Sequence, residues 1–252
     1  MNRTGLIIAL AVAAIVGLVF GLFPQLDLAM SAPFSGNTFG LHLYPSVQGA
    51  RDVGLWVPTL LIIPVVAAFV LKLLLPRRRL LISGRAIIFL VSTMALGPGL
   101  LVNVALKDHW GRPRPIDVTQ FGGDQHFVAW WDPRGDCPGN CSFVSGDVSG
   151  ALWTIAPAAL VPPQWRAIAY GAALTLGLGM AALRIVSGAH FFSDVVFAGV
   201  FTFLIIWLVH GLIYRWPRMR WTDAGIEHAI ERLALPGHDF LLGLLRKRKT
   251  EL

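Results

Sequence analysis

Charged side chains are scarce in this chain. Asp, Glu, Lys and Arg make up 14% of its 252 residues, while hydrophobic residues make up 55%. A soluble domain carries about 25% charged residues, so this chain lacks the charge needed to cover a water-facing surface. The scarcity excludes an ordinary soluble domain. Together with a mean hydropathy of +0.64, it indicates a protein that crosses a membrane several times.

Cysteine is also scarce, with only Cys137 and Cys141 in the whole sequence. A structural zinc site needs more ligands than this pair supplies, so we predict no metal site. The two cysteines lie in a polar segment that we place outside the cytoplasm. A disulfide is expected in such a compartment, and two free thiols are the alternative.

Long apolar runs are what the sequence has in excess. A membrane-spanning helix needs about 20 mostly apolar residues. The first run resembles a signal peptide, but it is long and lacks a clear small-residue cleavage site, so we interpret it as a retained span. We therefore predict an all-α fold, a bundle of six transmembrane helices. The predicted spans lie at about residues 5–23, 55–75, 84–106, 148–164, 167–186 and 191–214.

The basic residues predict the orientation of these spans. The net charge of +7 does not indicate a nucleic acid partner, because the basic residues occur in short clusters between apolar runs. Cytoplasmic loops carry the excess of Lys and Arg. We thus place both termini in the cytoplasm and the gaps 24–54, 107–147 and 187–190 outside. The side that the termini share holds Arg3, Arg77, Arg78, Arg79, Arg166, Arg215, Arg218, Arg220 and the basic run 246–249.

The C-terminal residues 222–252 are too short and too polar for another span. Ile226, Ile230 and Leu233 fall near helical spacing, and a basic run follows at 246–249. This pattern predicts interfacial amphipathic helices on the cytoplasmic face, with a partly disordered tail as the alternative. We predict one membrane domain, residues 1–221, followed by this tail.

Three cations gather in the segment 107–115, at the outer end of the third predicted span. Lys107, Arg112 and Arg114 lie within eight residues of one another. Arginine offers a planar fork to phosphate oxygens, and lysine offers a point charge. The segment therefore predicts an anion site. A basic cap at the membrane interface is the alternative, which the outward orientation disfavours.

A second segment, 140–150, opens the fourth predicted span with small residues. The unpaired N–H groups and the positive dipole end of a helix N-terminus attract anions. Ser145 and Gly146 are therefore candidate phosphate ligands. Ordinary helix capping is the alternative for this short pattern.

The third segment, 183–194, joins the last two predicted spans. Arg184 ends one span, His190 begins the next, and Asp194 follows four residues later. This spacing places His190 and Asp194 on one helix face. The carboxylate can then accept the Nδ1 proton and leave Nε2 as a nucleophile or base. A structural histidine is the alternative. Together the three segments predict a site that holds a phosphate dianion and transfers it.

The three segments resemble the three signatures of the type 2 phosphatidic acid phosphatase (PAP2) superfamily. The resemblance covers residues 107–194 and the six-span layout, and it implies the helix bundle of that superfamily. It also implies that His190 forms a phosphohistidine, that Asp194 orients it, and that no metal or cofactor takes part. The residues that it implies as phosphate ligands are Lys107, Arg114, Ser145, Gly146 and Arg184.

Three positions depart from the signatures. Leu183 stands where the family has Ser, Val144 where it has Pro, and Asp147 where it has His. The family's histidine protonates the leaving alkoxide. We expect a protonated Asp147 to take this role, since burial and a nearby dianion raise the pKa of a carboxyl group. His109 is the alternative acid and Arg112 a further substrate contact, while an inactive member of the family is the remaining interpretation.

The runs KDHWGRPRP and CSFVSGD resemble the branch of this superfamily that contains bacterial lipid A phosphatases of the 4′ type. We expect a phosphorylated membrane lipid as substrate, hydrolysed at the periplasmic face of the bacterial inner membrane. Phosphatidylglycerophosphate and undecaprenyl pyrophosphate are alternative substrates. Transfer to an acceptor lipid is an alternative reaction, and a non-catalytic transporter is the alternative from another class. The sequence predicts no oligomeric state.

Overall fold

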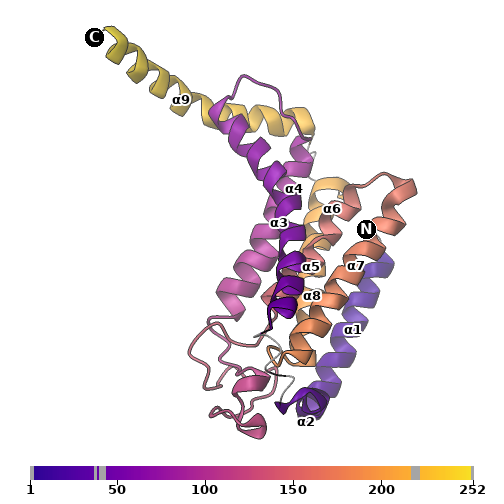
Figure 1. The fold of residues 1–252 in the computed structure, drawn as a ribbon. Coiled ribbons are helices and arrows are strands. Elements are labelled where there is room, and N and C mark those ends of the chain that lie inside the picture. The colour runs from indigo at the N-terminus through magenta and orange to yellow at the C-terminus, as the bar shows by residue number, and fades with distance from the viewer. Residues whose placement is uncertain (1–2, 37–38, 40–43, 217–221, 251–252) are drawn as a thin grey trace. The chain divides into compact units, whose positions relative to one another are not determined.

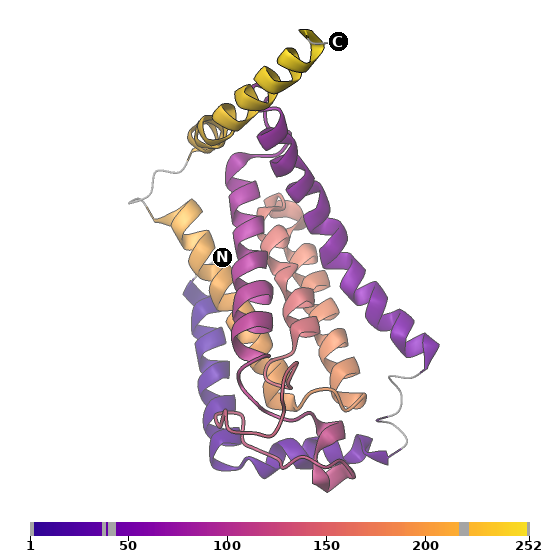
Figure 2. The same cartoon turned by 90° about the vertical axis from the view of Figure 1, so that its left-hand side faces the viewer.

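The computed structural model describes residues 3–36, 39, 44–216 and 222–250. Every named element within these ranges is helical (Figures 1 and 2), which confirms the predicted all-α fold. The elements are α1 (Arg3–Leu22), α2 (Gln25–Ser31), η1 (Ala32–Phe34), α3 (Pro45–Leu74), α4 (Gly84–Met94), η3 (Ala95–Leu106), η4 (Pro115–Asp117), η5 (Thr119–Phe121), α5 (Gly146–Trp153), α6 (Ile155–Leu160), α7 (Pro163–Val186), α8 (Phe192–His210), η6 (Gly211–Arg215) and α9 (Asp223–Thr250).

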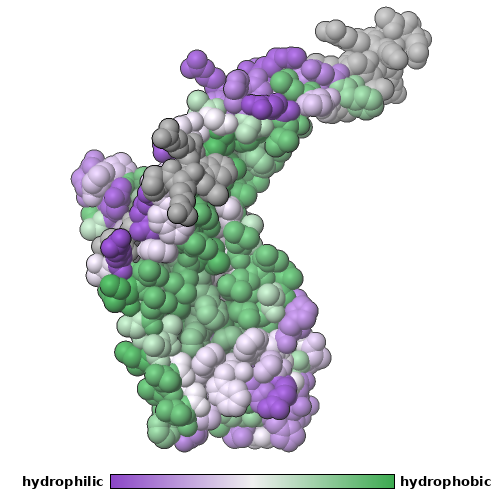
Figure 3. Space-filling model, turned by 180° about the vertical axis from the view of Figure 1, so that it is seen from behind, coloured by the Kyte–Doolittle hydropathy of each residue, from purple (hydrophilic) through white to green (hydrophobic). Residues whose placement is uncertain are grey.

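Five helical stretches in the described part of the chain are long and apolar enough to cross a membrane. A helix satisfies its interior backbone groups internally, which a hydrocarbon environment demands. The outer faces expose large apolar side chains such as Leu18 and Leu178. Figure 3 shows that hydrophobic residues cover the long helices on the face opposite to that of Figure 1. The five stretches are α1, α3, α4 with η3, α7, and α8 with η6. They match five of the predicted spans in position, length and apolar composition.

The remaining predicted span, 148–164, is not one long helix. Its residues form the short helices α5 and α6, which meet at Thr154 and both pack against α7. The Thr154 hydroxyl donates to the carbonyl of Ala151 at 2.6 Å. Pro157 lacks the N–H that would bond to Trp153, and its ring crowds that carbonyl. These two residues explain why the helix breaks, and the predicted set of six long helices is not reproduced.

Helix α3 begins ten residues earlier than the predicted span, at Pro45 instead of Leu55. The part of the predicted outer gap 24–54 that follows residue 44 is therefore helical. The same gap also contains α2 and η1. One consequence is that Arg51 is carried on a helix, not on a loop.

The helix that follows α4 has wider turns than an α-helix. Residues Ala95–Leu106 form a π-helix, η3, which contains Pro98. Asn103 Nδ2 donates to the Pro98 carbonyl at 2.7 Å, and Lys107 N bonds to Val102 O at 3.0 Å, five residues back. Such wide turns accommodate a proline inside a helix, because they bond the backbone groups that the proline leaves unpaired. The π-helix ends directly before Lys107.

The chain divides into two compact units, residues 1–59 with 93–208, and residues 60–92 with 209–252. In the first unit, the ring of Phe143 stacks with those of Trp110 and Trp130, at centroid distances of 5.1 and 6.1 Å. Trp130 also lies 4.4 Å from Phe197 of α8. These aromatic contacts fix the long segment between η3 and α5 against the helices.

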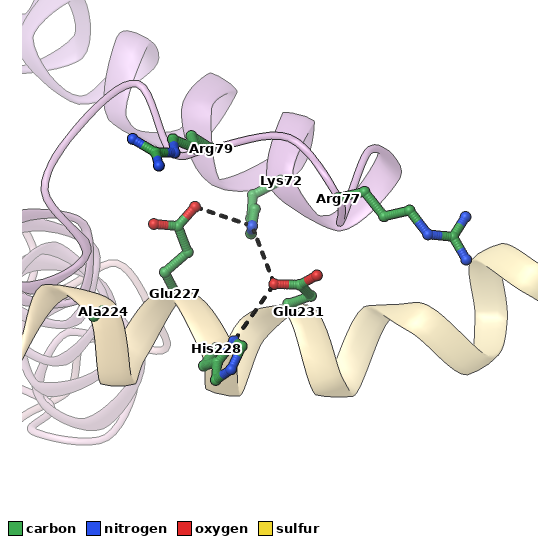
Figure 4. A pocket seen from close by; sticks show the side chains of 7 residues that line it. All are labelled: Lys72, Arg77, Arg79, Ala224, Glu227, His228 and Glu231. Atoms are coloured by element: carbon green, nitrogen blue, oxygen red, sulfur yellow. Dashed lines mark hydrogen bonds and ion pairs between the residues drawn. The ribbon is translucent and has the colours of Figure 1, made fainter.

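In the second unit, α9 packs on the turn that follows α3. Lys72 is buried, and its amine lies 3.1 Å from Glu227 and 3.9 Å from Glu231 (Figure 4). Ile226 and Ile230 are buried beside these contacts, whereas Leu233 is exposed. The predicted helical periodicity of the tail is confirmed for this part of α9. Its cytoplasmic location stays a prediction.

Candidate active site

The three predicted segments meet at one end of the long helices of the first unit (Figures 1 and 2). Lys107 follows η3, Ser145 caps the N-terminus of α5, and Arg184 lies in the last turn of α7. His190 lies between α7 and α8. Helix ends from distant parts of the sequence therefore surround one small volume.

The turn between α7 and α8 fixes His190. The backbone N–H groups of Ala189 and His190 both bond to the Arg184 carbonyl, at 3.0 and 3.3 Å. Gly188 has φ +68°, and a Cβ there would lie 2.6 Å from the Phe39 ring. Only glycine meets both conditions without strain, so this residue sets the path that places His190.

His190 is buried and electrically neutral. Its Nδ1 lies 2.7 Å from the Ser142 carbonyl. Because a carbonyl only accepts, Nδ1 carries the proton and Nε2 keeps its lone pair. Burial lowers the pKa of His190 well below 6.5, and the positive charges of Arg184, Arg114 and Lys107 lower it further. The imidazole therefore offers an unprotonated Nε2 at neutral pH.

Asp194 does not take the Nδ1 proton of His190, contrary to the contact expected from their spacing. α8 begins at Phe192, so His190 precedes the helix and the i, i+4 geometry does not apply to it. Asp194 instead accepts from the Ser142 hydroxyl at 2.5 Å and from the Phe191 N–H at 2.9 Å. It holds Ser142, and the Ser142 carbonyl holds His190.

Arg112, which the sequence suggested as a substrate contact, belongs to a buried ion-pair network. Its side chain is fully buried and lies between Asp27, at 2.8 Å, and Asp194. It also donates to Ser193 Oγ at 2.9 Å and to the Val128 carbonyl at 3.1 Å. These contacts occupy the guanidinium and leave it no face for a substrate. Sequence reasoning missed Asp27, whose only signal is a carboxylate among apolar neighbours.

Lys107 and Arg114 are joined through Asn140. Lys107 Nζ donates to Asn140 Oδ1 at 2.8 Å, and Arg114 Nη2 donates to the Asn140 carbonyl at 2.8 Å. A disulfide between Cys137 and Cys141 encloses Asn140. Burial lowers the pKa of Lys107, and the neighbouring charges of Arg114 and Arg184 add to this effect. Such crowding of cations is the arrangement that an anionic ligand would relieve.

Asp147 is an ionised carboxylate clamped by two arginines. Arg51 Nε lies 2.7 Å from Asp147 Oδ2, Arg51 Nη2 lies 3.3 Å from Oδ1, and Arg184 Nε lies 3.3 Å from Oδ2. Burial alone would raise the pKa of Asp147, but the hydrogen bond from Arg51 and the charges of Arg184 and Lys107 hold it below its ordinary value. The sequence predicted a protonated general acid at Asp147, and that role stays a prediction.

Arg51 is a second residue that sequence reasoning missed. It lies early in α3, far from the three segments in sequence. One signal could have found it, because Arg51 stands in an outward gap, where cations are under-represented.

The N-terminus of α5 lies against η3 and Lys107. The Ser145 hydroxyl accepts from the Val148 N–H at 3.4 Å, and so caps the helix. A Cβ on Gly146 would lie 2.8 Å from Asn103 Oδ1 and 3.6 Å from Lys107 Nζ. Glycine therefore allows the Asn103 side chain to lie against this helix start, with the Lys107 amine at ordinary contact distance.

His109, the alternative acid, is exposed. Its Nδ1 lies 3.0 Å from the Val104 carbonyl, five residues earlier in the chain. The part of the chain that the structure describes contains no cluster of three His, Cys, Asp or Glu side chains placed to hold a metal ion. What it does contain is a neutral histidine facing an excess of cations, which suits the transfer of a phosphoryl group.

Comparison with known proteins supports this interpretation. The family model described as the PAP2 superfamily matches residues 85–220. The lipid A 4'-phosphatase of Francisella tularensis subsp. novicida (strain U112) is 35% identical over 219 residues, which cover 85% of this chain and 98% of that protein. The lipid A 4'-phosphatase of Rhizobium leguminosarum is 43% identical over 106 residues, 42% of this chain and 46% of that protein.

No solved structure matches the chain. The family match covers more than half of the sequence and includes the segments 107–115, 140–150 and 183–194. The chain therefore belongs to the PAP2 superfamily, as its signatures predicted, and it is a phosphoric monoester hydrolase.

Proposed function

We propose that this protein is a lipid phosphatase of the bacterial inner membrane that removes the 4′-phosphate of lipid A. The observation that carries the proposal is His190, a buried neutral imidazole whose Nδ1 is fixed by the Ser142 carbonyl. The substrate rests on the relatives named lipid A 4'-phosphatase, of which one aligns with most of this chain.

The proposed reaction has two steps. His190 Nε2 attacks the phosphorus, an N–P bond forms, and the bond between phosphorus and the sugar oxygen breaks. The leaving oxygen takes a proton from solvent, because Asp147 is held ionised. Water then attacks the phosphohistidine, releases inorganic phosphate and returns Nε2 to its neutral form. Such a transfer depends mainly on position and on charge stabilisation.

The cations supply that stabilisation. Lys107, Arg114 and Arg184 surround His190 closely enough to depress its pKa, and they would bind the equatorial phosphate oxygens. Ser145 and Gly146 add the start of α5, where N–H groups are free. Arg51 joins this set as a ligand outside the three signatures. Asp194 acts as a positioning residue through Ser142.

The connectivity supports six membrane crossings. α7 ends at the site, so its first residue lies at the far end of the bundle. The segment α5–α6 must therefore carry the chain from the site to that far end, over about 22 Å for 15 residues. Six crossings place both termini opposite the site, and the basic clusters favour the cytoplasm for the termini. The site is then periplasmic.

The first test is phosphate release in detergent with EDTA from lipid A, phosphatidylglycerophosphate, phosphatidic acid and undecaprenyl pyrophosphate. We expect release from lipid A, lost in His190→Ala and kept in the control His228→Ala, whose residue lies in the second unit. Release that His190→Ala does not reduce would overturn the nucleophile. Loss of lipid phosphate without free phosphate would instead indicate transfer to an acceptor lipid.

A further inference from the structure

The disulfide between Cys137 and Cys141 closes a short loop, the disulfide loop, beside the candidate active site. The backbone of this loop is bonded to the segment 107–115 at both ends. The Cys137 N–H donates to the Gly111 carbonyl at 3.1 Å, and the Cys141 N–H donates to the Lys107 carbonyl at 2.9 Å. The loop is therefore fixed along the segment that carries two of the predicted phosphate ligands.

Asn140 is the residue of the disulfide loop that contacts both of these cations. Its carbonyl accepts from Arg114 Nη2 at 2.8 Å and from Arg114 Nε at 3.3 Å. Its side-chain Oδ1 accepts from Lys107 Nζ at 2.8 Å. The position of Arg114 therefore depends on the backbone of the loop, and that of Lys107 depends on the side chain of Asn140.

Both acceptors of Asn140 are neutral, which matters because the cations are crowded. Burial lowers the pKa of Lys107, and repulsion by the charge of Arg114 lowers it further. A carboxylate between the two would cancel part of their charge and compete with a phosphate dianion. An amide oxygen and a backbone carbonyl accept hydrogen bonds without adding charge. Asn140 can thus hold both cations and leave their full charge to an anion.

Two features restrict the backbone of Asn140. Its φ of +50° lies in the left-handed region, which asparagine tolerates better than most residues other than glycine. The disulfide joins residues only four positions apart. A cross-link across so short a loop stabilises the whole fold less than one across a long loop. Its main effect is local, because it limits the conformations that Asn140 can adopt.

We propose that Asn140 is a positioning residue that holds Lys107 and Arg114 for phosphate binding, and that it does so only while the disulfide is intact. The inference rests on the proposed phosphate-binding role of these two cations. A dithiol opens the disulfide by transferring two electrons and two protons. The S–S bond breaks, both cysteines become thiols, and the dithiol closes to its own disulfide. The site then binds phosphate well in an oxidising compartment and weakly in a reducing one.

Binding of inorganic phosphate to the full-length protein in detergent tests the positioning role. Asn140→Gly removes Oδ1 but keeps the carbonyl that bonds to Arg114, because glycine adopts a positive φ without strain. Gly139→Ala is the matched control in the same loop, since a Cβ there meets no atom within 4 Å. In a titration followed by ³¹P NMR, we expect the Kd for phosphate to rise about tenfold in Asn140→Gly. Gly139→Ala should keep the native value.

A double-mutant cycle separates positioning from a general effect on the fold. If Asn140 acts through Lys107, Asn140→Gly should change the Kd by less than about twofold in a background that already contains Lys107→Met. In hydrolysis of p-nitrophenyl phosphate, a soluble phosphomonoester, Asn140→Gly should raise KM and leave kcat within about threefold. Equal effects of Asn140→Gly in both backgrounds would overturn the positioning role.

The same titration separates this inference from the proposed phosphate site. Weakened binding in Lys107→Met together with native binding in Asn140→Gly would overturn the inference alone. Unchanged binding in Lys107→Met would overturn the proposed phosphate-binding role of Lys107, and the inference with it.

Dithiothreitol tests the role of the disulfide. Reduction should raise the Kd of the native protein about tenfold or more, and reoxidation should restore it. The double variant Cys137→Ser with Cys141→Ser should bind weakly with and without the reductant. Native binding by the reduced protein or by the double variant would overturn this role. Loss of the helical circular dichroism on reduction would overturn it as well, because the disulfide would then support the whole fold.

Discussion

At the scale of single residues, the site depends on how each charge is partnered. Asp147 takes the place of a histidine in the second signature, and its carboxylate pairs with Arg51 and Arg184. His190 owes its neutral form to burial and to neighbouring cations. The roles of both residues follow from their neighbours and not from their side-chain type.

The pH dependence of the free enzyme should reflect the depressed pKa of His190. Protonation removes the nucleophile, so the acid limb of kcat/KM should lie below the ordinary value of 6.5. Replacing a repelling cation, as in Arg114→Leu, should raise the pKa of His190 and move this limb to higher pH. A pH profile of kcat/KM for both enzymes measures the shift, and a limb that stays in place contradicts the assignment.

Asp147→Asn distinguishes a clamp from a general acid. If Asp147 only aligns Arg51 and Arg184, the substitution removes that alignment alone. KM should then rise severalfold while kcat stays within about threefold. Loss of a general acid would lower kcat by about a hundredfold or more. Steady-state kinetics with lipid A separates the two outcomes.

Arg51 should contribute to binding although it lies outside the matched family region. A hydrogen bond to a charged group contributes about 1.5–3 kcal/mol, so Arg51→Ala should lower kcat/KM by about ten- to a hundredfold. Arg134→Ala is the control, because Arg134 pairs with Asp132 on an exposed loop. Equal activity of the two variants would remove Arg51 from the site.

At the scale of elements, the start of α5 packs closely against η3. A Cβ on Gly146 would meet Asn103 and Lys107, whereas a Cβ on Gly150 of the same helix would have no atom within 4 Å. The two glycines therefore serve different purposes, although they lie in the same short helix. Gly146 is needed for proximity, and Gly150 is not.

Gly146→Ala should displace α5 from η3 and lower kcat/KM by about tenfold or more, since a misplacement of about 1 Å can cost a hundredfold. Gly150→Ala should keep the activity and raise the melting temperature slightly, because alanine favours helix by about 1 kcal/mol over glycine. Kinetics and thermal unfolding of the two variants measure this contrast, and equal activities would argue against the tight contact.

At the scale of the whole molecule, the orientation can be tested by labelling. In a background with Cys137→Ser and Cys141→Ser, a single cysteine replaces exposed Gln120 or exposed Arg79. We expect Gln120→Cys in spheroplasts to react with a membrane-impermeant maleimide, and Arg79→Cys to react only after lysis. The reverse pattern would invert the topology and place the site in the cytoplasm.

The sequence by itself determined the helical fold, five of the long apolar helices and the residues of the three signatures. Hydrophobicity and short spacing carry this information, because both are local properties of the chain. The break between α5 and α6 also has a local cause in the sequence, Thr154 and Pro157. Hydropathy is averaged over a whole window, so it predicts one long span at 148–164 although the helix breaks there.

Only the tertiary structure decided the partners of the charged residues. Arg51 meets Asp147 across 96 positions, and Asp27 meets Arg112 across 85. No spacing rule reaches so far, since such pairs form only when helices pack. The same packing pairs Asp194 with Ser142 and Arg112 and leaves His190 bonded to a backbone carbonyl. The sequence supplies the reacting groups, and the packing of the helices determines which of them are charged, free or occupied.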